Sequence, residues 1–214
     1  MKEIQVIKRD GVSEPLNLDK IHVMVERACN GLAGVSESLV EMNDNLQFFD
    51  GIKTSDIQEI LIRSANDLIS LDAPNYQFVA ARLLLFGLRK AVYNGHPDGH
   101  PPLLEHVEKC VSRKIYDASI LKKYTEQEWE KLSGYMDHER DYLFTYAGVR
   151  QVVDKYLVQD RSTGNLFETP QYMYMMIAAT LFQDDDKFYR LEYVRKYYDA
   201  ISKHRINIPT PVMA

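Results

Sequence analysis

Apolar residues recur every three or four positions through most of this chain, which is the spacing of one face of an α-helix. In the first part of the chain this pattern predicts four helices, beginning near Asn17, Ser36, Thr54 or Ser55, and Pro74. The third predicted helix has the clearest pattern, because one face carries Ile57, Ile60, Leu61, Ala65, Leu68 and Ile69.

A short hairpin is predicted before these helices. Residues 4–8 and 12–16 are compatible with strands, and the Asp10-Gly11 pair between them is typical of a tight turn. A β-hairpin that caps a four-helix bundle therefore accounts for residues 1–94. The turn-rich segment NGHPDGHPP, residues 94–102, is taken as the first domain boundary.

The rest of the chain is again mostly helical. Helices are predicted around 103–111, after a capping box formed by Thr125 and Glu128, through 138–156, after Thr169-Pro170, and through 187–204. A second small hairpin is predicted around residues 162–164, and residues 206–214 resemble a single strand. We therefore predict a mainly α fold, with a helical domain over 95–204 and the start of another domain over 205–214. The terminal strand would pair with a hairpin, with a partner chain, or with more of a longer protein, because unpaired backbone groups are costly.

Composition narrows the function classes. The formal net charge of −5 disfavours a broad electrostatic surface for nucleic acid, although a local anion site needs only a few donors. No apolar run reaches the roughly 18 residues that would suggest a membrane helix, and the first residues lack the apolar core of a signal peptide. Two scattered cysteines, Cys29 and Cys110, fit neither a disulfide framework nor a zinc site. We expect a cytoplasmic protein with no membrane and no nucleic-acid partner.

The predicted hairpin carries the most informative polar residues. Lys8 and Arg9 beside the turn could simply be solvated surface charges. Alternatively they could bind an anion together with Asn17 and Lys20, because a helix N-terminus favours phosphate. A second helix start, at residues 53–55, and Lys90 at the end of the fourth helix could join them if the bundle folds as predicted. The chain has no Walker loop and no G-x-G-x-x-G motif, so a nucleotide site would be of another kind.

Other polar groups favour ordinary structural roles. His96 and His100 lie in a loop without ligand partners at metal-binding spacing, and neither cysteine has an evident histidine partner. The acidic run at 184–186 suits the N-terminus of a helix. No catalytic constellation emerges from the residues, and no metal site is predicted.

Several segments resemble a known family. VIKRDG (6–11), LNLDKIH (16–22), DGIKTSDIQE (50–59), DAPNYQFVAARLLLFGLRK (72–90) and YLVQDRSTGNLFETPQ (156–171) are similar to the N-terminal third of the class I ribonucleotide reductase large subunit. The resemblance implies that residues 1–94 form an ATP-cone, the allosteric domain on which ATP activates and dATP inhibits the enzyme. It also implies that residues 205–214 lead into an α/β catalytic barrel that is missing here.

The resemblance also implies site residues. The allosteric nucleotide, with Mg²⁺, would be bound by Lys8, Arg9, Glu14, Pro15, Leu16, Asn17, Leu18, Asp19, Lys20, Ile21, Thr54, Gln58, Phe86 and Lys90. Lys8 and Lys90 would hold phosphates, and Glu14 and Asn17 would lie near the base or ribose. Asp56 matches an allosteric coupling position, and Thr210 matches a substrate-contacting threonine. Some relatives carry histidine at the positions of Gln58 and Gly87, and glycine has no side chain that could donate a hydrogen bond.

The chemistry of the family would lie outside this chain. The catalytic cysteines, the acid–base glutamate and the radical-relay tyrosines of the family would follow Ala214, so the resemblance implies a truncated or split subunit without a redox cofactor. It would not catalyse alone. Catalysis would need a complementary chain carrying the barrel and a radical-generating small (beta) subunit, in a homo- or hetero-oligomer. Alternatives are a free-standing nucleotide-binding or oligomerisation module, and an incomplete gene product with an unused site.

Overall fold

The computed structural model describes residues 4–42, 48–93, 96, 99–160 and 162–209. Within these ranges the chain is mainly helical with one small sheet, which confirms the predicted fold class. Its packing divides it into two compact units, residues 1–87 with 144–150 and residues 88–143 with 151–214. Helices α4 (Tyr76–Tyr93) and α7 (Tyr146–Lys155) contribute residues to both units.

The first unit contains a three-stranded sheet with the order β2-β1-β3. Strand β1 (Gln5–Ile7) pairs antiparallel with β2 (Ser13–Pro15), which confirms the predicted hairpin. Strand β3 (Ile52–Lys53) pairs parallel with β1 and was not predicted, because two residues give no periodic pattern. This third strand matters because α3 begins at the next residue, so the parallel pairing brings the start of α3 to the hairpin.

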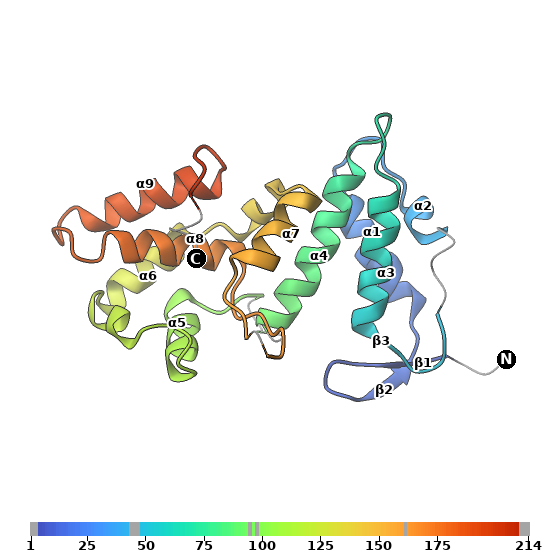
Figure 1. Cartoon of the computed structure of the whole chain (residues 1–214), viewed down its shortest axis with the longest axis horizontal. Coiled ribbons are helices and arrows are strands. Elements are labelled where there is room, and N and C mark those ends of the chain that lie inside the picture. Colours follow the sequence, from blue (N-terminus) through green and yellow to red (C-terminus); the bar gives the residue numbers. More distant parts are fainter. Residues whose placement is uncertain (1–3, 43–47, 94–95, 97–98, 161, 210–214) are drawn as a thin grey trace. The chain divides into compact units, whose positions relative to one another are not determined.

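Helices α1 (Leu18–Cys29), α2 (Glu37–Met42), α3 (Thr54–Asp67) and the first part of α4 form the core of this unit (Figure 1). The inner faces are mainly apolar, and the apolar residues with no exposed surface include Val25, Ala28, Val40, Leu61, Ala65, Val79, Ala80 and Leu83. Arg82 of α4 donates hydrogen bonds to the carbonyl oxygens of Ala28 and Asn30, at 3.1 and 2.7 Å, and so satisfies acceptors at the C-terminus of α1. The helix predicted to start near Ser36 was expected to carry Leu39, Val40, Leu46 and Phe49. Leu39 and Val40 lie in α2, but Phe49 is exposed outside it, and Leu46 lies outside the described residues.

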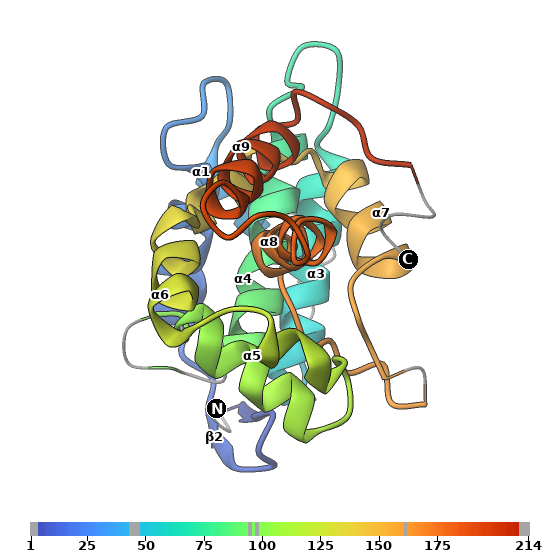
Figure 2. The same cartoon turned by 90° about the vertical axis from the view of Figure 1, so that its left-hand side faces the viewer.

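The second unit contains α5 (Leu103–Ser112), α6 (Glu126–Tyr135), α8 (Pro170–Leu181) and α9 (Arg190–Ser202), with the 3-10 helices η1 (Ala118–Lys122) and η2 (His138–Leu143). Helices α8 and α9 lie side by side and α9 also packs on α6 (Figure 2). The largest fully buried side chains here include Trp129, Leu132, Tyr172, Met175 and Tyr198. The capping box of Thr125 and Glu128 forms as predicted at the start of α6.

Three expectations for the second part need correction. The helix predicted over 138–156 is divided into η2 and α7, because Phe144 and Thr145 interrupt it and the Thr145 hydroxyl accepts from the Gly148 amide at 3.3 Å. The predicted hairpin around 162–164 is reduced to one bridge between Gln159 and Leu166. Residues 206–209 form no strand with any described residue, and the Ile206 amide donates to the Ala200 carbonyl at the end of α9, at 3.4 Å. The rest of the predicted strand, 210–214, lies outside the described residues.

Candidate functional site

The turn between β1 and β2 has a defined backbone geometry. The Lys8 amide donates to the Val12 carbonyl at 2.9 Å, and the Gly11 amide donates to the Lys8 carbonyl at 3.0 Å. Gly11 has a φ of 84°, which a residue with a side chain rarely adopts, and the Asp10 carboxylate accepts from the Val12 amide at 3.0 Å. Lys8 therefore follows directly from an ordered strand.

Glu14 bridges two lysines beside this turn. One carboxylate oxygen lies 3.4 Å from the Lys8 ammonium, and the other lies 3.3 Å from the Lys20 ammonium. The hydrogen bond from Lys20 is the main cause that lowers the pKa of Glu14 below its ordinary value, and the charges of both lysines act in the same direction. All three side chains are partly exposed, so the cluster is open to solvent and to a ligand.

The N-terminus of α1 adds amide donors to this cluster. The Asn17 side chain caps the helix by accepting from the Lys20 amide at 3.0 Å, which confirms the predicted N-cap. Lys20 is therefore the third residue of the helix, and its ammonium lies at the end where the helix dipole favours an anion.

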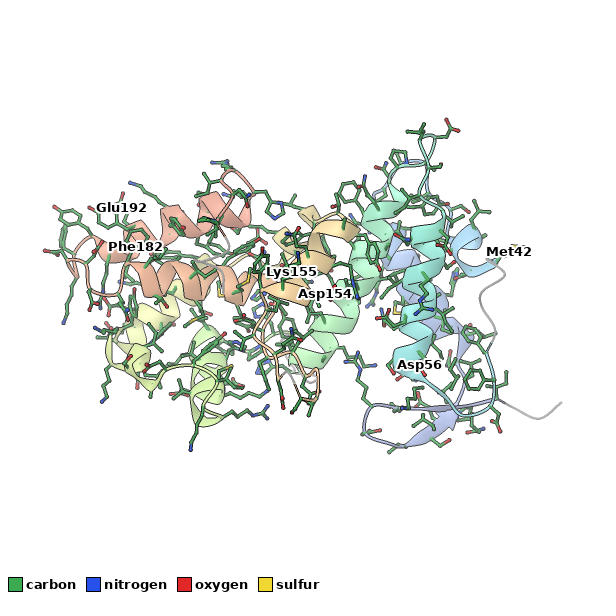
Figure 3. The ribbon with its side chains drawn as sticks, viewed as in Figure 1. Met42, Asp56, Asp154, Lys155, Phe182 and Glu192 are labelled. Atoms are coloured by element: carbon green, nitrogen blue, oxygen red, sulfur yellow. The ribbon has the colours of Figure 1, made fainter. Side chains whose placement is uncertain are left out.

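The N-terminus of α3 lies at the same hairpin. The parallel register pairs Ile7 with Lys53, the last residues of β1 and β3. Lys8 and Thr54 therefore each follow directly after the end of one of two neighbouring strands. No side chain caps α3, and the Ser55 hydroxyl donates to the Asp56 carboxylate at 3.2 Å instead. In Figure 3 Asp56 lies at the end of α3 that faces the hairpin. The start of α3 thus lies beside the end of β1 that leads into Lys8, whereas α1 follows β2, which pairs with the other side of β1.

Arg9 contacts α4 rather than the lysine cluster. Its guanidinium donates to the Gly87 carbonyl at 3.1 Å, and partial burial lowers the pKa of Arg9. The Gln58 amide of α3 donates to the Leu83 carbonyl at 2.5 Å, one helical turn earlier. A Cβ atom at Gly87 would lie 3.4 Å from the Gln58 Cγ and 3.8 Å from the Arg9 guanidinium, so Gln58 and Arg9 occupy the space beside this glycine. Hairpin, α3 and α4 are joined at this point.

The structure brings many of the expected site residues together. Lys8, Glu14 and Lys20 form the cluster, Asn17 caps the helix, Thr54 starts α3, and Arg9 and Gln58 meet beside Gly87. Leu18 and Asp19 are exposed in the first turn of α1, and Pro15 and Leu16 connect β2 to this helix. Ile21, by contrast, is buried, and Phe86 is half-buried on α4. Thr210 lies outside the described residues.

Lys90 belongs to the second unit. It is exposed near the end of α4, where it lines a cavity of about 500 Å³ with Arg89, Tyr93, Gly99, His100, Met136, Asp137, His138 and Glu139. Its neighbour Arg89 is engaged within this unit, because its guanidinium contacts the Asp141 carboxylate at 3.2 Å and the Tyr142 hydroxyl at 3.0 Å. Arg89 is therefore a structural residue of the second unit.

Sequence reasoning missed the backbone acceptors in this region. The Gly87 and Leu83 carbonyl oxygens receive the Arg9 and Gln58 side chains, and a backbone acceptor leaves no residue-type signal. Among the described residues, no group of three histidine, cysteine, aspartate or glutamate side chains could hold a metal ion. In the same part of the chain, no helix is both long enough and apolar enough to cross a membrane.

Two family models match the chain. Residues 4–91 match the ATP cone domain, and residues 142–214 match the domain described as "Ribonucleotide reductase, all-alpha domain". The ATP cone match includes the whole lysine cluster and both helix N-termini described above.

Curated relatives match along the whole chain. This chain is 49% identical over 213 residues to the ribonucleoside-diphosphate reductase subunit alpha of Haemophilus influenzae. It is 47% identical over 213 residues to the ribonucleoside-diphosphate reductase 1 subunit alpha of Escherichia coli. The match to the subunit alpha of Enterobacteria phage T4 is 40% over 216 residues. Each of these alignments covers 100% of this chain but 28% of the relative's length. The chain therefore carries an ATP cone domain and the all-alpha domain of the ribonucleotide reductase family.

Proposed function

We propose that the first unit binds ATP or dATP, with Mg²⁺, as an allosteric effector. The observation that supports this most strongly is the cluster of Lys8 and Lys20 around Glu14, beside the N-terminus of α1 and within the segment that matches the ATP cone domain. Ammonium groups and free helix amides are the donors that phosphate groups prefer. We assign Lys8, Lys20 and Thr54 to the phosphates, and Asn17 and Glu14 to the base or ribose side.

The wider role follows from the relatives. We propose that the chain is the regulatory N-terminal part of a ribonucleoside-diphosphate reductase large subunit, with the activity domain at residues 1–94 and a helical domain at 95–204. Residues 205–214 would begin the catalytic barrel. Nucleotide binding would then control the reduction of ribonucleoside diphosphates to deoxyribonucleotides, carried out together with a complementary catalytic chain and a beta subunit.

Isothermal titration with ATP and dATP tests the site. Lys8→Ala and Lys20→Ala should each weaken binding by about 1.5–3 kcal/mol, because each removes a charged hydrogen bond to phosphate. This corresponds to a loss of about 10- to 150-fold in affinity. Lys131→Ala, an exposed lysine on α6 of the second unit, is the matched control and should bind as the wild type does. Unchanged binding in both site variants would refute the assignment.

Mixing experiments test the wider role. The chain would be combined with the remainder of the Haemophilus influenzae alpha subunit and with its beta subunit, and reduction of CDP would be followed with and without ATP. We expect association and ATP-stimulated product formation. If sedimentation shows no association at micromolar concentration and no product forms, the proposed complementation is wrong, while nucleotide binding by the isolated chain would remain measurable.

A further inference from the structure

Glu14 places a carboxylate between the two lysines of the candidate site. Each of its oxygens faces one ammonium, at 3.4 Å from Lys8 and 3.3 Å from Lys20. A phosphate group offers the same arrangement, because it also presents separate anionic oxygens to separate cations. The carboxylate therefore occupies a position that suits a phosphate.

Three different elements build this arrangement. Glu14 lies in β2 opposite Val6, Lys8 follows the end of β1, and Lys20 is the third residue of α1. The helix dipole and the first amides of α1 favour an anion near this point. The Asp10 carboxylate, by comparison, is used within the turn by the Val12 amide. Glu14 is thus the acidic group that both ammonium groups contact within the described cluster.

The contacts are weak enough to exchange. The side chains of Lys8 and Lys20 are 39% and 67% exposed, and that of Glu14 is 31% exposed. Ion pairs this open to water contribute little to stability. An incoming ligand that carries several negative charges can therefore displace the carboxylate without unfolding the hairpin.

We propose that Glu14 is a built-in competing anion that holds Lys8 and Lys20 in place and is displaced by the phosphates of the bound nucleotide. The inference rests on the proposed function and concerns how the affinity of that nucleotide site is set. Displacement breaks both ion pairs, so Glu14 lowers the affinity of the two lysines for phosphate groups. Glu14 thereby sets the nucleotide concentration at which the site fills.

Inorganic tripolyphosphate is the direct probe, because it has phosphates but neither base nor ribose. Glu14→Gln should bind tripolyphosphate about three- to tenfold more tightly than the wild type, since two weak ion pairs no longer compete. Glu14→Asp keeps the charge on a shorter side chain that cannot reach both ammonium groups, so we expect an intermediate affinity. In a Lys8→Ala, Lys20→Ala background, Glu14→Gln should give no gain.

Glu41→Gln is the matched control. Glu41 also forms an ion pair in the first unit, with His22 at 2.8 Å, but it has no contact with the cluster. Removing its charge should leave tripolyphosphate binding unchanged. An equal gain in Glu41→Gln and Glu14→Gln would indicate a general charge effect and overturn the proposal.

ATP titrations of the wild type distinguish a failure of the proposal for Glu14 from a failure of the proposed nucleotide site. Suppose that the wild type binds ATP and that Lys8→Ala weakens ATP binding, but that Glu14→Gln binds tripolyphosphate no more tightly than the wild type. The proposed role of Glu14 is then wrong, and the proposed nucleotide site stands. If the wild type binds no ATP, the proposed function fails and this inference fails with it.

Discussion

At the scale of single residues, the second unit buries several polar groups that must stay neutral or paired. His106 of α5 is 2% exposed and stacks on Tyr172, with ring centroids 3.8 Å apart and planes inclined by 7°. Its Nε2 lies 3.5 Å from the Tyr116 hydroxyl. Burial lowers the pKa of His106 to about 4, because the charged imidazolium would lose its hydration there.

This lowered pKa predicts a pH-dependent stability. Below its ordinary pKa of about 6.5, His106 takes up a proton in the unfolded chain but stays neutral in the folded one, so stability falls as pH falls toward about 4. The expected loss is about 1.4 kcal/mol per pH unit in that window. His106→Phe keeps the ring stack and removes the titration. Between pH 7.5 and pH 5 the wild type should therefore lose about 2 kcal/mol more of its unfolding free energy, measured in urea, than His106→Phe loses. Equal pH slopes in both proteins would contradict the neutral, buried histidine.

At the scale of elements, side-chain hydrogen bonds join both the hairpin and α3 to α4 in the first unit. Arg9 and Gln58 reach two carbonyl groups of α4 on either side of a helical turn, and Gly87 leaves them room. The hairpin is thus tied to α4 as well as to its own sheet. A rearrangement of the hairpin on ligand binding would change the hydrogen bond from Arg9 to the Gly87 carbonyl of α4.

Gly87→Ala tests how closely this junction is packed. The added Cβ would lie 3.4 and 3.5 Å from the Gln58 side chain and 3.8 Å from Arg9, which is ordinary contact. Because alanine favours a helix interior over glycine, we expect the variant to be more stable by about 0.5–1 kcal/mol in urea unfolding.

Gly134→Ala in α6 is the control for this substitution, because a Cβ there meets nothing within 4 Å. Because Gly134 lies in the last turn of α6, it should show a gain no larger than that of a helix interior. A loss of stability in Gly87→Ala beside a gain in Gly134→Ala would mean that Gln58 and Arg9 leave no room at Gly87.

Some of the elements have local sequence signals that predict them, and others do not. The hairpin, the Asn17 cap and the long helices follow from local signals, namely the Asp-Gly turn, the capping residue and the apolar period. Strand β3 is too short for a periodic signal, and it forms only because β1 offers a free edge. The break between η2 and α7 depends on a side-chain cap at Thr145 that an apolar pattern does not report.

The candidate site was predictable in part for similar reasons. Lys8, Asn17 and Lys20 lie close along the chain around a recognisable turn and helix start, so their association follows from local structure. The bridge from Glu14 to both lysines, and the engagement of Arg9 with the Gly87 carbonyl, depend on tertiary geometry and on a backbone acceptor. Arg89 was indistinguishable from Lys90 in the sequence, and only packing within the second unit shows that it is paired.

At the scale of the whole molecule, the chain combines a segment that matches the ATP cone domain with one that matches a ribonucleotide reductase all-alpha domain, and it spans 28% of the length of the curated relatives reported above. The chemistry of those relatives therefore does not define what this chain does by itself. Its own candidate activity is the binding of a nucleotide at the hairpin edge of the first unit. In the second unit, the cavity beside Lys90 is the competing location for a ligand.

Hydrogen–deuterium exchange of the wild type with and without ATP and Mg²⁺ tests this central claim most directly. Amides of bound segments exchange more slowly, because the ligand removes the open states through which exchange occurs. We predict slower exchange in residues 5–20 and 53–58, which contain the hairpin and both helix N-termini, and no change in α5 or α6. Unchanged exchange at saturating ATP, or protection confined to the cavity of the second unit, would contradict the account.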